Sequence, residues 1–229
     1  MDISSIIVAL DDPNPTKNYD LMDRLAGVAT RIKIGSIAFS SQGPKILEYA
    51  HQKGFKIFLD LKFHDIPQTV SKAVLSVTQI CPIEFITIHA LGGSAMIQAA
   101  KEVASMQEVP TSILAVTILT SHEQAWLSEI SLQHTLEQEA LTLGNLAKNS
   151  GADGVVCSAH EVSQMRSALG NNFIYMVPGI RLEGDAKHDQ KRVATPKEAL
   201  DLGATYLVMG RSITEAKDPA SVLTGLKSL

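Results

Sequence analysis

Short apolar segments alternate along the chain with longer segments whose apolar residues recur at helical spacing. The apolar segments predict eight strands, at about residues 6–10, 31–35, 56–63, 85–90, 113–119, 154–157, 174–177 and 206–210. The segments between them predict helices at about residues 19–29, 44–53, 67–80, 94–106, 136–149, 159–169 and 195–203, with a short helix capped by Ser121 and a closing helix from Asp218. Regular alternation of this kind is typical of a parallel sheet covered by helices.

The number of units predicts the architecture. Eight strand–helix units favour closure into a (β/α)₈ barrel, or TIM barrel, as one α/β domain over residues 1–229. An open, doubly wound sheet is the alternative, because periodicity does not show whether a sheet closes. The stretch at about residues 182–194 has no clear element and is charged and polar. It is either a surface loop or a mobile lid over a site.

The third predicted strand carries charge where a buried strand is usually apolar. Successive strand residues point to opposite faces, so Asp60 and Lys62 share one face, while alternate residues from Leu59 are apolar and share the other. A second carboxylate, Asp65, lies just past the strand. Ion pairs taken out of water lose in desolvation much of what they gain in attraction, so stability alone rarely explains them. The stretch indicates a functional charge array, with a surface ion pair as the alternative.

Polar residues also follow the other predicted strands. In a barrel, catalytic and binding groups gather at the carboxyl ends of the strands. The residues at or just after those ends are Asp11, Lys33, His89, Thr120, Arg181, Gly210 and Arg211. Together they predict one functional rim, although His89 by itself is more typical of an ordinary cap or salt bridge.

The end of the eighth predicted strand favours a phosphate site. Barrels often hold phosphate between the loops after strands seven and eight, at a short helix N-terminus. Gly210 permits close approach of the backbone, and Arg211 can offer a phosphate two parallel charged hydrogen bonds. Arg181, after the seventh strand, is placed to assist.

Composition narrows the classes of function. The net charge of −4 and the lack of a Lys/Arg cluster argue against nucleic acid as the partner. No apolar run is long enough to span a bilayer, and the first residues do not form a signal peptide. Cys81 and Cys157 are far apart and outside any CxxC motif, so we expect buried reduced thiols in a cytoplasmic protein; a disulfide or a metal pair is the alternative.

Motifs for metal, nucleotide-loop or nucleophile chemistry are missing from the sequence. It contains no HExxH, Walker loop, GxGxxG or nucleophile elbow. Asp60 and Asp65 are possible Mg²⁺ ligands, but the positive charge of Lys62 between them disfavours a cation there. We therefore expect chemistry by charge placement and proton transfer, with no metal and no cofactor.

Seven segments resemble the orotidine 5′-phosphate decarboxylase family, in order and over essentially the whole chain. They are ALD (9–11), KIG (33–35), DLKFHDIP (60–67), VTILTS (116–121), VPGIR (177–181), DQKR (189–192) and MGRSI (209–213). The Asp-x-Lys-x-x-Asp core is shared with related sugar-phosphate barrels, whereas the longer string through Pro67, together with PGIR and GR, is specific.

The resemblance implies decarboxylation of orotidine 5′-phosphate to uridine 5′-phosphate, the last step of de novo UMP biosynthesis, without a cofactor. It implies that Lys62 donates a proton to C6 of the pyrimidine once carbon dioxide has left, and that Asp60 lies beside Lys62 and the substrate carboxylate. It also implies a homodimer in which Asp65 and Thr69 reach the neighbouring subunit's site. The remaining implied contacts are Asp11 and Lys33 with the ribose, Thr120 with the base, and Arg181, Gln190, Gly210 and Arg211 with the phosphate, Gln190 being carried by the lid.

Two alternatives stay open. A related barrel enzyme makes or decarboxylates a keto-sugar phosphate through a metal-bound enediolate, and it needs Mg²⁺. A non-catalytic barrel would act as a sensor that binds uridine 5′-phosphate and leaves orotidine 5′-phosphate unchanged.

Overall fold

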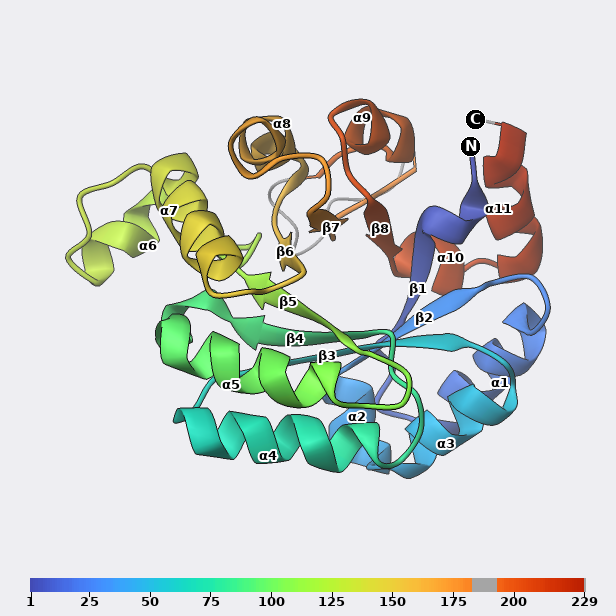
Figure 1. Ribbon diagram of the computed structural model, residues 1–229. Coiled ribbons are helices and arrows are strands. Elements are labelled where there is room, and N and C mark those ends of the chain that lie inside the picture. Colours follow the sequence, from blue (N-terminus) through green and yellow to red (C-terminus); the bar gives the residue numbers. More distant parts are fainter. Residues whose placement is uncertain (183–192, 229) are drawn as a thin grey trace.

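Eight parallel strands form a closed barrel in the computed structural model, which describes residues 1–182 and 193–228 (Figure 1). The strands are β1 (Ile6–Leu10), β2 (Arg31–Gly35), β3 (Lys56–Phe63), β4 (Phe85–His89), β5 (Ser112–Val116), β6 (Gly154–Val156), β7 (Ile174–Val177) and β8 (Tyr206–Met209). Each strand pairs with the next, and β8 pairs in parallel with β1. The prediction of a TIM barrel is confirmed, and the open sheet is excluded.

Helices surround this barrel on the outside (Figure 1). They are α1 (Pro15–Leu25), α2 (Ser36–Gln42), α3 (Lys45–Gln52), α4 (Pro67–Thr78), α5 (Gly93–Ser105), α6 (Gln124–Glu129), α7 (Leu136–Asn149), α8 (Ala159–Leu169), α9 (Pro196–Asp201), α10 (Arg211–Thr214) and α11 (Pro219–Gly225), with 3₁₀ turns η1 (Ile3–Ser5), η2 (Ala90–Gly92) and η3 (Leu226–Ser228). The two termini meet, since the amino group of Met1 donates to the carbonyl of Lys227 at 3.0 Å.

Two apolar clusters lie on either side of the barrel wall and set the direction of each side chain. The inner cluster contains Ile7, Ala9 and Phe58, whereas Leu59 belongs to the outer cluster between the strands and the helices. The inner face of β3 therefore passes from Phe58 in the core to the charged residues at its carboxyl end. This alternation is the physical reason why the predicted charges of β3 face the barrel mouth.

Helices α1 and α2 differ from the sequence prediction. Helix α1 begins at Pro15, about four residues before the predicted start, because the side chain of Asn14 accepts the N–H of Thr16 at 3.0 Å and a proline fits the first helical position. Helix α2 was not predicted, since Ala38 is its one buried residue and so its sequence carries no apolar stripe.

Strand β5 and the next helix, α6, also differ from the sequence prediction. Strand β5 ends at Val116 and not at Leu119, because its two neighbours end there: His89 of β4 and Val156 of β6 both pair with Val116. The capping box predicted at Ser121 is wrong, since α6 begins at Gln124 and its cap, Glu123, makes no side-chain capping bond. Helix α9, by contrast, begins with a capping box, in which Thr195 is the cap and Glu198 its reciprocal partner.

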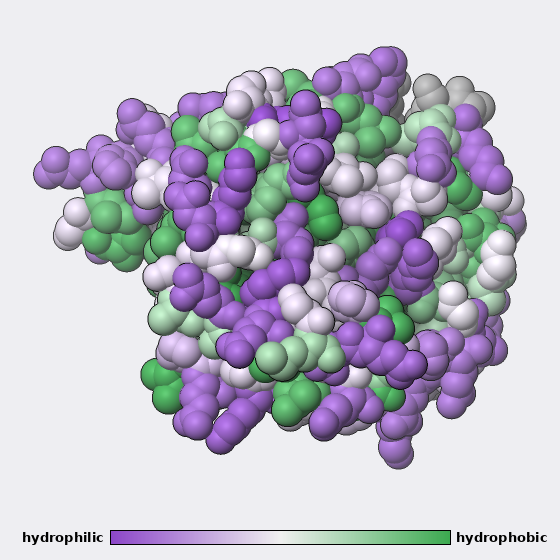
Figure 2. Space-filling view, viewed as in Figure 1, coloured by the Kyte–Doolittle hydropathy of each residue, from purple (hydrophilic) through white to green (hydrophobic). Residues whose placement is uncertain are grey.

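The surface seen in Figure 2 is mostly polar, with apolar side chains gathered on the segment around α6, which projects beyond α7. In residues 1–182 and 193–228 no helix combines the length and the apolar character that a bilayer crossing requires.

The two cysteines, Cys81 and Cys157, are both buried. Burial, with the nearby Glu48 carboxylate, raises the pKa of the Cys81 thiol to about 11, so it stays protonated.

Candidate active site

A cavity of about 1080 Å³ opens at the carboxyl ends of the strands. Many of the predicted site residues line it: Asp11, Lys33, Asp60, Lys62, Thr120, Arg181, Gly210 and Arg211. They come from six different strands or the segments that follow them, which the closed barrel brings to one rim. These residues, far apart in the sequence, therefore line one cavity in the folded chain.

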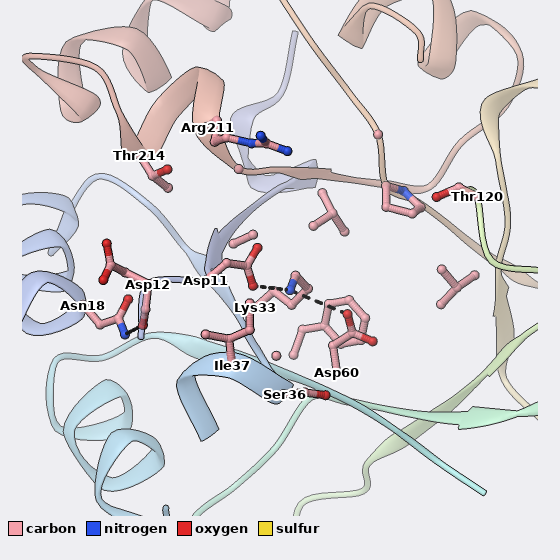
Figure 3. Close-up of a pocket in the computed structure, with 18 of the residues that line it drawn as sticks. Asp11, Asp12, Asn18, Lys33, Ser36, Ile37, Asp60, Thr120, Arg211 and Thr214 are labelled. Atoms are coloured by element: carbon pink, nitrogen blue, oxygen red, sulfur yellow. Dashed lines mark hydrogen bonds and ion pairs between the residues drawn. The ribbon is translucent and has the colours of Figure 1, made fainter. Parts of the chain in front are cut away.

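Alternating charges form a chain across the floor of this cavity. Lys62 Nζ lies 2.8 Å from Asp60 Oδ1, and Lys33 Nζ lies 3.6 Å from Asp60 Oδ2 and 2.9 Å from Asp11 Oδ1. Figure 3 shows Asp11, Lys33 and Asp60 in one row, with Arg211 and Thr214 on the far side of the cavity from α2. We call Asp11, Lys33, Asp60 and Lys62 the charge array. It places two ammonium groups and two carboxylates within reach of one bound molecule.

Asp60 is the buried centre of the charge array. Its side chain is 12% exposed, whereas that of Lys62 is 32% exposed and that of Asp11 is 49% exposed. Burial by itself favours the neutral acid, but the charges of Lys33 and Lys62, with hydrogen bonds from Lys62 and Thr87, hold the pKa of Asp60 below its ordinary value. Asp60 is therefore ionised at neutral pH and fixes the ammonium of Lys62 at the cavity floor.

Gly35, at the end of β2, makes room for the other pair of the array. A Cβ at this position would lie 2.9 Å from Lys33 Nζ and 3.2 Å from Asp11 Oδ1, so any side chain would displace one of them. The glycine thus leaves room for the Lys33 ammonium to reach Asp11 beside the strand end.

The proposed phosphate-binding residues lie at the ends of β7 and β8. Arg211 follows Gly210 and opens α10, and Figure 3 places it above Asp11. A Cβ on Gly210 would meet just one atom within 4 Å, the Cβ of Ala9 at 3.8 Å, so the backbone here borders open space. Arg181 lines the same cavity and donates from Nη1 to the carbonyl of Ile180 at 2.9 Å. Two guanidinium groups therefore border one end of the cavity.

Two of the predicted site residues, Asp65 and Thr69, are not in this cavity wall. Asp65 and Thr69 are exposed beside the start of α4, and Asp65 Oδ1 accepts the backbone N–H of Ile66 at 2.6 Å. Neither lines the cavity of its own chain. Gln190 and most of the predicted lid, residues 182–194, lie outside the described residues.

His89, at the end of β4, does not fit the interpretation as a cap. Its side chain makes no capping hydrogen bond to η2, and its ring centroid lies 5.5 Å from that of His64. Burial is the main cause that lowers the pKa of His89, and the nearby charges of His64 and Lys62 lower it further. The carboxylate of Asp60 acts in the opposite direction. The imidazole is thus neutral at physiological pH.

Several residues of the site were missed by the sequence analysis. Thr87 of β4 is fully buried and contacts Asp60; alternation from Phe85, on the inner face, was the available signal. Asp12, Ser36, Ile37 and Thr214 also line the cavity. Ser36 and Ile37 were missed because α2 was not predicted. In the described part of the chain, no group of three or more His, Cys, Asp or Glu side chains is arranged to hold a metal ion.

Comparison with known proteins assigns the family. A family described as "Orotidine 5'-phosphate decarboxylase / HUMPS family" matches residues 4–225. The chain is 46% identical to an orotidine 5′-phosphate decarboxylase of Marinomonas sp., over 96% of this chain and 94% of that one. It is 44% identical to one of Nitrosococcus oceani, over 100% and 98% of the two chains. A crystal structure of orotidine 5′-phosphate decarboxylase from Lactobacillus acidophilus superposes with a TM-score of 0.86 at 37% identity, covering 97% of each chain. This chain therefore belongs to the orotidine 5′-phosphate decarboxylase / HUMPS family.

Proposed function

We propose that this protein decarboxylates orotidine 5′-phosphate to uridine 5′-phosphate, the last step of de novo UMP biosynthesis, with Lys62 as the proton donor. The observation that carries the proposal is the position of the Lys62 ammonium. Buried, ionised Asp60 holds it at the floor of a cavity whose other end carries Arg181 and Arg211. The family match and the names of the curated relatives support the same reaction.

The chemistry needs a cation at this place. When the bond between C6 and the carboxylate breaks, its electron pair stays on C6, which has no adjacent carbonyl to delocalise it, and carbon dioxide leaves. A fixed ammonium directed at C6 stabilises the developing charge without reorganisation, and it then donates a proton to give the product. The neutral amine of Lys62 regains its proton from water. No electron acceptor or metal enters this balance.

The other residues of the cavity would bind the ribose, the base and the phosphate of the substrate. Asp11 and Lys33 are paired at the end of β1 and β2, where they would bind the ribose hydroxyls, and Thr120 would bind the base. Arg181, the backbone at Gly210 and Arg211 would hold the phosphate, joined by Gln190 from the lid. Binding energy from the remote phosphate would drive closure of the lid, which excludes water from the charge array.

A second subunit would complete the site. Asp65 and Thr69 are exposed in this chain, and Ile66 between them is 64% exposed, unusually open for an isoleucine. Ile37, which lines the cavity mouth, is 52% exposed. We propose that these surfaces pack against a second copy, so that Asp65 and Thr69 enter the neighbouring site and Lys62 lies between two carboxylates.

The buried thiols suit the reducing cytoplasm, which we propose as the location of the protein.

The test is a decarboxylation assay on the purified protein. The ultraviolet absorbance of orotidine 5′-phosphate should fall as uridine 5′-phosphate forms, at the same rate with and without EDTA. A rate that EDTA removes and Mg²⁺ restores would instead point to the metal-dependent reaction. Binding of uridine 5′-phosphate with no change in the substrate's absorbance would point to a sensor. Either of these results contradicts the proposal.

A further inference from the structure

Strand β3 is interrupted next to its neighbour β4 at the catalytic residues. Leu59 pairs with Ile86, and the next paired residues are Phe63 and Ile88, so residues 60–62 of β3 lie opposite residue 87 alone. Lys62 has a φ of +52°, a left-handed conformation that costs free energy for a residue with a Cβ. A bulge of this kind aims a side chain and leaves backbone groups without their ladder partners.

Thr87 occupies the position opposite this bulge and bonds to both of its charged residues. Its hydroxyl oxygen accepts the backbone N–H of Lys62 at 2.9 Å, and the hydroxyl donates to Asp60 Oδ1 at 3.0 Å. The same Asp60 oxygen accepts from Lys62 Nζ at 2.8 Å. Thr87 is fully buried, at 0% exposure, and does not line the cavity. One hydroxyl thus ties the main chain of Lys62 to the carboxylate that holds its ammonium.

We propose that Thr87 is a positioning residue for decarboxylation, which holds Lys62 in its left-handed backbone conformation and Asp60 in the rotamer that orients the Lys62 ammonium. This inference rests on the proposed function. Without the hydroxyl, the part-buried Lys62 N–H loses its partner, and the bulge relaxes toward a regular ladder. The ammonium then moves relative to C6, while the groups that bind ribose and phosphate stay in place.

The positioning role is tested by Thr87→Val, which keeps the branched shape and removes the hydroxyl. We expect kcat for decarboxylation to fall by about 10- to 100-fold, as for misplacement of a catalytic group by about 1 Å, and KM to change by less than about threefold. Thr87→Ser, which keeps the hydroxyl, should restore most of kcat. The matched control is Thr111→Val, because Thr111 is also buried but donates its hydroxyl to the carbonyl of Ile83 at 2.8 Å, away from the site.

The outcomes separate this inference from the proposed function. A wild-type protein without decarboxylase activity contradicts the proposed function itself. An active wild type with Thr87→Val at wild-type kcat overturns the positioning role, and so does an equal loss of kcat in Thr111→Val, since that loss would follow from stability alone. If Thr87→Val does not fold, Thr87→Ser and Thr87→Ala differ by the hydroxyl alone, and equal kcat in those two overturns the role as well.

Discussion

Replacing Lys62 by alanine should lower kcat/KM for orotidine 5′-phosphate by about 10⁴-fold or more, because one side chain performs two tasks. Removing a positioned acid typically costs 10²- to 10⁴-fold, and removing a preorganised electrostatic donor costs about 10²- to 10³-fold. The two losses overlap, because the same nitrogen stabilises the carbanion and protonates it. The measurement is the absorbance assay under steady-state conditions, with the folded state of the variant checked by thermal unfolding.

The control for Lys62→Ala lies on the same strand. Lys56 opens β3 at the opposite end of the barrel, where its side chain is 57% exposed and its Nζ lies 3.6 Å from Glu84 Oε1. Lys56→Ala removes the same charge and should change kcat/KM by less than about twofold, as for an exposed surface substitution. A Lys62→Ala protein that keeps more than a tenth of wild-type activity would remove Lys62 from the mechanism.

Two inactive variants should restore each other if the site is shared between subunits. Lys62→Ala and Asp65→Ala chains, co-expressed with different tags, give mixed dimers that can be isolated. In such a dimer, one site combines Lys62 of one chain with Asp65 of the other and is intact, whereas the second site lacks both. We expect about half of the wild-type activity per dimer, because one of two symmetry-related sites is complete.

The control pair for this experiment is Lys62→Ala with Asp60→Ala. Asp60 and Lys62 contact each other within one chain, so no arrangement of the two chains gives an intact site. This mixed dimer should stay inactive. The shared site is refuted if the dimers of Lys62→Ala and Asp65→Ala form and remain inactive as well.

Alternation along β3 was enough to predict the face of Asp60 and Lys62, because a buried strand has two distinct sides. The pattern could not reveal the bulge. Residues with a left-handed backbone conformation are usually glycine or asparagine. Here the residue is Lys62, and its backbone N–H is bonded to Thr87 of the next strand. Contacts of that kind are set by pairing between strands and leave no trace in the local sequence.

The walls of the cavity show a second limit of prediction from sequence. Residues after the strands could be assigned to one rim, because parallel strands in a barrel end together. Ser36 and Ile37 were not found, because α2 buries little and lacks apolar periodicity. Asp65 and Thr69 are exposed at the start of α4. Their exposure depends on which side of α4 packs against the barrel, and the local sequence does not show this.

The position of the Lys62 nitrogen relative to the product is the most direct test of the central claim. A crystal structure with bound uridine 5′-phosphate should place Lys62 Nζ within about 3.5 Å of C6, in the plane of the pyrimidine, with Asp60 Oδ1 still in contact with the ammonium. A structure in which Nζ points away from C6, while the phosphate is held at Arg211, would contradict the mechanism.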